Sequence, residues 1–187
     1  ATISIEDYKS GDKLIPYHII NEVKGSDLSG LKYEQLMPYT QPIDGDAFKV
    51  VIGDFVTTSD GTGIVHIAPS FGSDDFKVAR QYGLGSLTLV DKRGRFLEEV
   101  TDFANEFVKE QYLNEEERAI ELEKQKVIWK DTIKNLDKYL SIDERIALKL
   151  KIENKAFKIE KYEHSYPHCW RTDKPILYYP LDSWFIK

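Results

Sequence analysis

Hydrophobic and polar residues alternate along much of the first 70 positions of the chain. Residues 13–23 read KLIPYHIINEV and meet the turn pattern KGSD, and residues 47–58 read AFKVVIGDFVTT, as expected for strand, turn and strand. The segment 63–68, GIVHIA, is β-branched and bounded by Gly and Pro, which is typical of a short strand. A hairpin turn is expected at 59–61, because Asp-Gly suits backbone positions with positive φ.

After Pro69 the pattern changes to the spacing of a helix. Ser73 is expected to cap this helix, and Asp74 and Asp75 fall in its first turn, where the helix dipole favours negative charge. Gly83 is expected to end the helix, because glycine readily adopts the left-handed conformation of a C-terminal cap.

Two further helical regions are predicted downstream. One helix is expected to begin near Asp102, and residues 113–157 are dense in Glu, Lys, Leu and Ile, which have high helix propensity. The sequence from Ser141 to Glu144 matches a capping box and predicts another helix start. We interpret residues 110–157 as a helical insertion in a β core.

The remaining segments return to a β pattern. Residues 86–100, SLTLVDKRGRFLEEV, predict a hairpin that turns at Arg93-Gly94. Residues 164–187 are rich in aromatic residues and predict a long β-ribbon, whose prolines favour edge strands. The pattern as a whole predicts a mainly β fold with helices.

Composition narrows the class of protein. The chain has 187 residues, 41% hydrophobic and 31% charged, which is ordinary for a globular domain. The net charge of −6 argues against a broad nucleic-acid surface but leaves room for contact with an RNA end. No apolar run approaches the roughly 20 residues that span a bilayer. The single cysteine, Cys169, fits a reducing compartment, so we expect a cytoplasmic location without a membrane partner.

The two ends of the sequence are unusual for a free-standing protein. The first residue is not Met, and the chain stops at SWFIK, within a strand-like apolar stretch. We therefore expect the chain to be a piece of a longer polypeptide.

Residues 61–76, GTGIVHIAPSFGSDDF, carry the densest candidate chemistry. His66 has two interpretations: a buried structural histidine, or a ring that projects into a pocket near Asp75. Adjacent helix positions point in different directions, so only one of Asp74 and Asp75 is expected to face such a pocket. A stand-alone metal hydrolase using His66 and Asp75 is a further hypothesis, although two ligands are too few for the usual metal sites.

Other residue groups give weaker predictions. His164, His168 and Cys169 lack the paired cysteines of a zinc knuckle, so we expect no metal site there. Cys169 also lacks an identifiable orienting group for a nucleophile. The Gly-Thr-Gly at 61–63 precedes a strand instead of following one, which excludes a dinucleotide-binding fingerprint.

Three segments carry a family resemblance. GTGIVHIAPSFGSDDF resembles the signature of the editing domain of class I isoleucyl-tRNA synthetases and, less closely, of the valyl and leucyl enzymes. HSYPHCWRTDKPILYY and the terminal SWFIK resemble the stretch where that domain returns to the catalytic domain. KGSDLSGLKYEQLMPY resembles a further segment of the same domain.

The resemblance implies a β-barrel editing domain with flanking helices, over residues 1–163, with the helical insertion at about 110–157. It implies that 164–187 is a ribbon returning toward the catalytic domain. The implied activity is hydrolysis of the ester that joins a wrong amino acid, chiefly valine, to the tRNA for isoleucine. A missing methylene provides only about 1–3 kcal/mol of discrimination, a limit for which this enzyme family is the standard example.

The resemblance also implies roles for particular residues. Asp75 would bind the α-ammonium of the misattached amino acid, and His66 would line the side-chain pocket and exclude isoleucine. Phe71 and Gly72 would form the wall and floor of the loop, and Asp74 would be a helix-start charge. The implied partners are the aminoacylated 3′ end of tRNA and the other synthetase domains. No cofactor is expected in this chain, since ATP and Mg belong to the parent enzyme's catalytic domain.

One departure from the family pattern leaves an alternative open. The family's pocket also uses a threonine-rich stretch of the form WTTTPWT, which is absent from these 187 residues; Thr57-Thr58 is not followed by Pro-Trp. We expect half of the pocket to be missing. The alternative is therefore a non-catalytic module that binds an amino acid or a tRNA end.

Overall fold

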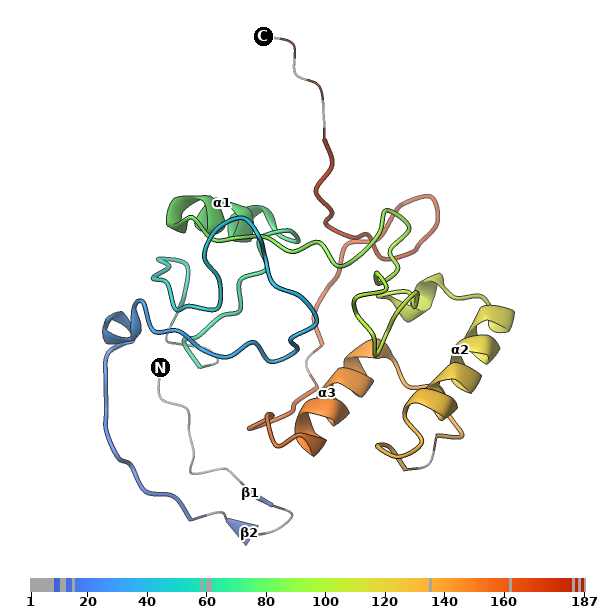
Figure 1. Cartoon of the computed structure of the whole chain (residues 1–187), viewed down its shortest axis with the longest axis horizontal. Coiled ribbons are helices and arrows are strands. Elements are labelled where there is room, and N and C mark those ends of the chain that lie inside the picture. The colour runs from blue at the N-terminus through green and yellow to red at the C-terminus, as the bar shows by residue number, and fades with distance from the viewer. Residues whose placement is uncertain are drawn as a thin grey trace. The chain divides into compact units, whose positions relative to one another are not determined.

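The computed structural model divides into two compact units (Figure 1). Unit 1 comprises Ala1–Gln35 and Pro42–Ser86, and unit 2 comprises Leu36–Gln41 and Leu87–Lys187. The structure describes residues 9–10, 13–14, 16–57, 59, 62–134, 136–161, 163–182, 184 and 186. The predicted turn at 59–61 lies largely outside these residues.

Unit 1 contains short regular elements. Strands β1 (Lys9–Ser10) and β2 (Lys13–Leu14) pair antiparallel, and the 3-10 helix η2 spans Gly25–Leu28. Helix α1 spans Ser73–Tyr82, and Val78 and Ala79 are buried on it.

The predicted features of α1 hold except at its first residue. Asp74 and Asp75 lie in the first turn, and Gly83 ends the helix with φ 61°, in the left-handed region that glycine tolerates. The prediction that Ser73 caps the helix is wrong. Gly72 is the N-cap, and no side-chain hydrogen bond caps this end of the helix.

The predicted mainly β fold, with a β-barrel, is wrong. Beyond β1 and β2, pairing in the described residues of unit 1 is limited to isolated bridges, Lys32↔Lys49 and Asp46↔Leu84. The backbone at 30–33 bonds to that at 48–50, but Phe48 has φ 53°, which interrupts the extended conformation that a ladder requires. The alternation of hydrophobic and polar residues therefore indicated a preference for extended backbone. It did not determine whether neighbouring segments pair into continuous strands.

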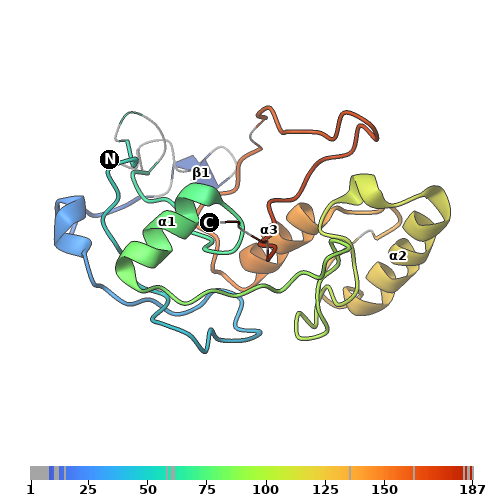
Figure 2. The same cartoon turned by 90° about the horizontal axis from the view of Figure 1, so that it is seen from above.

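Unit 2 contains the remaining helices. The 3-10 helix η3 spans Glu110–Tyr112, α2 spans Glu115–Ile128 and α3 spans Ile142–Ile152; α2 and α3 are drawn in yellow and orange (Figure 1, Figure 2). Capping boxes begin both long helices, from Asn114 and Ser141, and the box at Ser141 confirms the predicted helix start.

The core of unit 2 is a cluster of buried apolar side chains. Phe103 is fully buried, and the centre of its ring lies 5.6 Å from that of Trp129 and 5.9 Å from that of Phe96, in tilted arrangements. The buried members of this cluster are Val100, Phe103, Trp129, Ile133 and Ile142.

Two fully buried polar side chains, Arg145 and Gln125, join segments of unit 2 by hydrogen bonds. Arg145 is fully buried and forms a bidentate ion pair with Glu106, one bond of which measures 2.9 Å. Gln125, also fully buried, donates to the Lys138 carbonyl at 3.1 Å and accepts from the Leu140 N–H at 3.0 Å. The Gln125 side chain of α2 thereby provides hydrogen-bond partners for two backbone groups of the loop that leads to α3.

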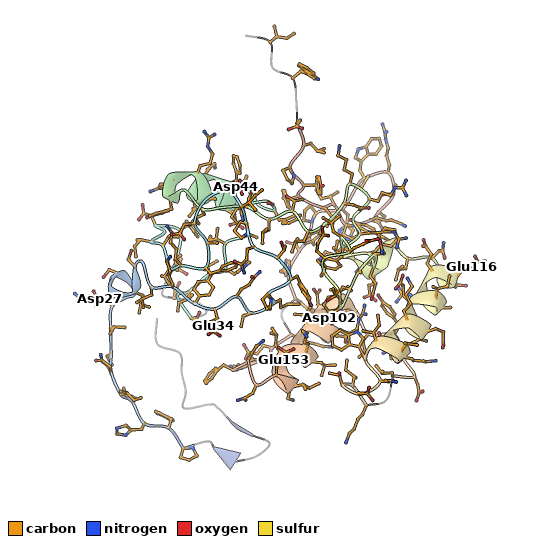
Figure 3. The ribbon with its side chains drawn as sticks, in the orientation of Figure 1. Asp27, Glu34, Asp44, Asp102, Glu116 and Glu153 are labelled. Carbon is orange, nitrogen blue, oxygen red and sulfur yellow. The ribbon has the colours of Figure 1, made fainter. Side chains whose placement is uncertain are left out.

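The short segment Leu36–Gln41 is anchored within unit 2. The Tyr39 hydroxyl donates to Asp102 at 2.6 Å, and burial together with that carboxylate raises the pKa of Tyr39. Lys149 of α3 bridges Asp102 at 3.0 Å and Glu153 at 2.7 Å; both acidic residues are labelled in Figure 3. Lys155 also pairs with Glu153 at 2.7 Å.

After residue 86, the predicted hairpin turn is confirmed and the predicted helix near Asp102 is wrong. The hairpin turn is present, since Val90 bridges Phe96 and the Asp91 N–H donates to the Arg95 carbonyl at 2.8 Å. The helix expected near Asp102 is absent, because residues 101–105 form turns and Asn105 adopts φ 64°.

The predicted boundaries at 110–157 and 164–187 stay predictions. In the second of these ranges, His168 bridges Pro175. Over the described residues, no helix combines the length and hydropathy that a membrane crossing requires.

Candidate functional site

An open cavity of about 740 Å³ in unit 1 is the principal candidate site. Its walls come from four stretches of the chain, within 25–33, 47–56, 63–69 and 78–85. The lining is mostly apolar, with Val50, Ile52 and Val65 among its residues. Its volume lies in the range of pockets for small organic ligands.

His66 lines this cavity. Its side chain is exposed, so the interpretation as a buried structural histidine is wrong. The segment 64–68 around it forms no regular strand, and Ile64 and Val65 are 64% and 54% exposed. The site therefore combines an imidazole with accessible apolar surface.

The other titratable side chains that line the cavity are Tyr33 and Lys49. Lys49 Nζ lies 3.0 Å from Asp46 Oδ2, and the Lys49 contact is the main cause that lowers the pKa of the Asp46 carboxyl. The Tyr33 ring meets Phe48 edge to face at 6.1 Å. Sequence reasoning missed these residues, because the contacts that gather them join segments distant in sequence.

Asp75 lies at the other end of the loop that begins at His66, and it is partly buried. Its Oδ2 accepts a hydrogen bond from the Ala68 N–H at 3.1 Å, which ties the loop back to the start of α1. In the described part of the chain Oδ1 accepts no hydrogen bond, so this oxygen can take a donor from a ligand. One carboxylate can thus both fix the loop and present an acceptor.

Gly72 has a steric role in this loop. A Cβ built on it would lie 3.1 Å from both Cγ and Oδ2 of Asp75, closer than an ordinary van der Waals contact. Its φ of −160° is extended backbone, so close approach and not backbone conformation favours glycine here.

Asp74 behaves as a helix-start charge. It is exposed and pairs with Lys77 at 2.8 Å, one turn further along α1. The carboxylates of Asp74 and Asp75 therefore have different partners, and the expectation that one of them faces the pocket stays a prediction.

The structure brings one of the four predicted site residues to the cavity. His66 lines it, whereas Phe71, Gly72 and Asp75 do not; Phe71 and Gly72 lie in the loop that joins His66 to α1, and Asp75 lies in the first turn of α1. The roles assigned to these three residues stay predictions.

The second group of candidate residues, His164, His168 and Cys169, lies in unit 2, before the turn at 170–172. His164 Nδ1 lies 3.0 Å from the Ser165 carbonyl, and His168 Nδ1 lies 2.8 Å from the Tyr166 carbonyl. A hydrogen bond with the Thr172 side chain is the main cause that lowers the pKa of Cys169. Across the described ranges, no three His, Cys, Asp or Glu side chains are grouped to hold a metal ion.

Comparison with known proteins finds relatives that carry the same name. The chain is 61% identical to an isoleucine--tRNA ligase of Cytophaga hutchinsonii over 99% of its length, and 49% identical to that of Bacteroides fragilis over 100%. It is 41% identical over 91% of its length to the enzyme of this name from Clostridium acetobutylicum. The chain spans 17% of the first two relatives and 13% of the third. No family model matches it.

Proposed function

The chain belongs to the isoleucine--tRNA ligase family, in which it corresponds to one segment, and from this premise we propose that it forms part of a site for hydrolysing misacylated tRNA. The proposed substrate is valine esterified to the tRNA for isoleucine. The observation that carries the proposal is the position of His66 on an open, mostly apolar cavity.

The proposed role of the cavity is selection by size. An apolar surface can receive the side chain of valine, and the His66 imidazole would limit the space for the additional methylene of isoleucine. Hydrolysis of the smaller ester supplies the discrimination that a single synthetic pocket lacks, since one methylene there is worth about 1–3 kcal/mol.

Asp75 would hold the substrate by its charge. The α-ammonium of an aminoacyl ester carries three N–H donors, and a carboxylate oxygen is their natural acceptor. Oδ1, which accepts no hydrogen bond from the described residues, supports this role, while the bond from the Ala68 N–H to Oδ2 orients the carboxylate. Phe71 and Gly72 would form the wall and floor beside it.

The chemical step would be attack of water on the ester carbonyl. The bond between the carbonyl carbon and the ribose oxygen breaks, and the ribose oxygen takes up a proton. A vicinal hydroxyl of the terminal ribose would assist the water, and the chain's part is to hold the ester in reach.

For the longer protein we propose ATP-dependent ligation of isoleucine to tRNA, the reaction that the relatives' name describes. ATP and Mg would bind outside this segment. The partners would then be the 3′ end of tRNA and the other domains of the same synthetase.

The sharpest test compares two neighbouring carboxylates in the full-length ligase. Asp75→Asn keeps the side-chain shape and an oxygen for the Ala68 N–H but removes the charge, so hydrolysis of Val-tRNA should fall about 10- to 100-fold. Asp74→Asn removes the same charge one residue away, from an exposed ion pair, and should change the rate less than twofold. Unchanged hydrolysis in Asp75→Asn would reject the proposed role.

The second candidate is binding without hydrolysis, which the absent threonine-rich stretch favours. The 187-residue chain would then bind a non-hydrolysable valyl-adenosine amide analogue yet leave Val-tRNA intact, whereas a chain extended through such a stretch would hydrolyse it. Turnover of Val-tRNA by the 187-residue chain would reject this candidate.

A further inference from the structure

Helix α2 turns a polar side toward the interior of unit 2. Its buried residues are Glu121 and Gln125, which are 4% and 0% exposed, and Trp129, which caps its C-terminal end, is 3% exposed. These three positions are four residues apart, so they lie along one side of the helix. A helix at a protein surface ordinarily presents an apolar stripe on its inner side, so α2 departs from the usual arrangement.

The opposite side of α2 exposes apolar residues to solvent. Ile120 is 56% exposed and Val127 is 71% exposed, and the seven residues between them correspond to about two helical turns. Ile128, beside Val127, is 47% exposed. At about 100° per residue, Ile120 and Val127 lie across the helix from Gln125. We call Ile120, Val127 and Ile128 the outer face of α2.

The charged residues between these apolar positions have partners within the helix. Glu123 pairs with Lys126 at 2.7 Å, and Lys124 pairs with Glu121 at 2.9 Å. Their charges therefore do not depend on a partner from outside. What the outer face offers to a second surface is its apolar area, and this selects an apolar occupant.

Specific contacts hold α2 in this orientation. At the start of the helix, Asn114 forms a capping box and Arg118 pairs with Glu110 at 3.1 Å. Near its end, Gln125 makes hydrogen bonds of 3.1 Å and 3.0 Å with two backbone groups of the loop before α3. Turning the helix to bury its apolar residues would break the Gln125 bonds, so exposure of the outer face follows from how unit 2 is built.

The size of the outer face indicates which kind of partner it fits. A stable complex of two free proteins buries about 800 Å² on each partner, from roughly 20–30 residues a side. Three apolar side chains on one helix do not supply that area. A segment of the same polypeptide needs less, because tethering can give it an effective concentration in the millimolar range. Since the chain spans 17% of its first two relatives, most of such a ligase lies outside it.

We propose that the outer face of α2 packs against an apolar segment of the same ligase polypeptide, outside these 187 residues. Ile120 and Val127 would be buried in this contact, and Ile128 would lie at its edge. The proposal rests on membership of the ligase family. It uses neither the His66 cavity nor the hydrolytic step, so it can fail without affecting the proposed function.

The first test measures access to the outer face. Val127→Cys and Glu115→Cys are each labelled with iodoacetamide, and peptide mass spectrometry separates the label on α2 from that on other cysteines. Both positions are exposed in the 187-residue chain, so they should react there at similar rates. In the full-length ligase, Val127→Cys should react about tenfold more slowly than in the chain. Glu115→Cys, the matched control on another side of α2, should keep its rate.

The second test disrupts the contact. Amide hydrogen exchange along α2 should be slower in the full-length ligase than in the 187-residue chain. The double variant Ile120→Lys with Val127→Lys should remove this difference, because burying unpaired charge is unfavourable. In the 187-residue chain both side chains face water and lysine has high helix propensity, so exchange should not become faster. Circular dichroism confirms that the variant is folded.

Three results would overturn the proposal. The first is an equal labelling rate of Val127→Cys in the full-length ligase and in the chain, which would show that the face stays open to a separate partner. The second is slow exchange along α2 that persists in the double lysine variant, which would place the protecting contact elsewhere. The third is a dimer of the 187-residue chain in analytical ultracentrifugation that the double lysine variant dissociates, which would assign the face to a second copy.

Discussion

The two units differ in how many of their apolar residues are buried. Unit 2 buries Phe103, Trp129 and their neighbours around a core and encloses Arg145 with Glu106. In the described part of unit 1, Val78 and Ala79 are the buried apolar residues, and most other apolar side chains line the open cavity or remain exposed. The unit with the packed core thus supplies stability, while the unit with the candidate site keeps apolar surface available to a ligand.

The largest predicted effect is on the buried ion pair of unit 2. Arg145→Ala leaves the Glu106 carboxylate buried without its partner, so the free energy of unfolding should fall by about 3–5 kcal/mol. Urea denaturation followed by Trp fluorescence measures this, because Trp129 lies in the same core.

The exposed pair Lys126–Glu123 on α2 provides the control. Lys126→Ala should cost at most about 1 kcal/mol, since water already solvates this pair. Equal losses in Arg145→Ala and Lys126→Ala would show that the buried pair does not hold unit 2 together.

The next effect concerns Gln125, which bridges α2 to the loop before α3. Gln125→Ala removes the acceptor for the Leu140 N–H and the donor to the Lys138 carbonyl, and should cost about 2 kcal/mol. Hydrogen exchange should show faster exchange of the Leu140 amide. An unchanged rate would mean that this amide does not depend on Gln125.

A core substitution in unit 1 should cost less. Val78→Ala removes apolar atoms that are 8% exposed, and should cost about 1 kcal/mol. Exchange of the α1 amides reports the effect locally. A loss above about 3 kcal/mol would contradict the contrast between the units, because it would reveal a packed core in unit 1.

The smallest effect is a dependence on pH in unit 2. Contacts with Lys149 and Lys155 lower the pKa of Glu153 from 4.5 to about 2. A depressed carboxyl pKa contributes stability above pH 4.5 that is lost as pH falls toward 2. Urea midpoints between pH 5 and pH 2.5 should fall less steeply for Glu153→Gln than for the unaltered chain. Parallel curves would show that these ion pairs add nothing measurable.

Sequence reasoning succeeded where the determinants are local. The acidic first turn and the Gly83 end of α1, and the capping box at Ser141, each depend on residues within one or two helical turns. The turn at Arg93-Gly94 was predictable for the same reason, since Gly94 adopts φ 81°.

Sequence reasoning failed where distant partners decide the structure. Alternation around 47–58 and 64–68 could not specify which neighbours complete a ladder, and Phe48 with φ 53° interrupts the pairing that does form. The segment after Asp102 has helical spacing, yet Asn105 turns the chain so that Phe107 bridges Arg95.

The candidate site shows the same division between local features, which the sequence predicted, and contacts between distant segments, which it did not. The motif around His66 was visible in sequence, and the family resemblance, rather than spacing, assigned His66 to a pocket. The contribution of Tyr33 and Lys49 to the cavity arises from contacts between distant segments. The hydrogen bond from Ala68 to Asp75 likewise required the folded loop.

The central claim, that the His66 cavity selects the esterified amino acid by size, is tested most directly by deacylation with His66→Ala in the full-length ligase. Rates are measured side by side on Val-tRNA and on correctly charged Ile-tRNA. Removal of the imidazole enlarges the cavity, so hydrolysis of Ile-tRNA should rise at least tenfold relative to that of Val-tRNA. An unchanged ratio of the two rates would contradict the account.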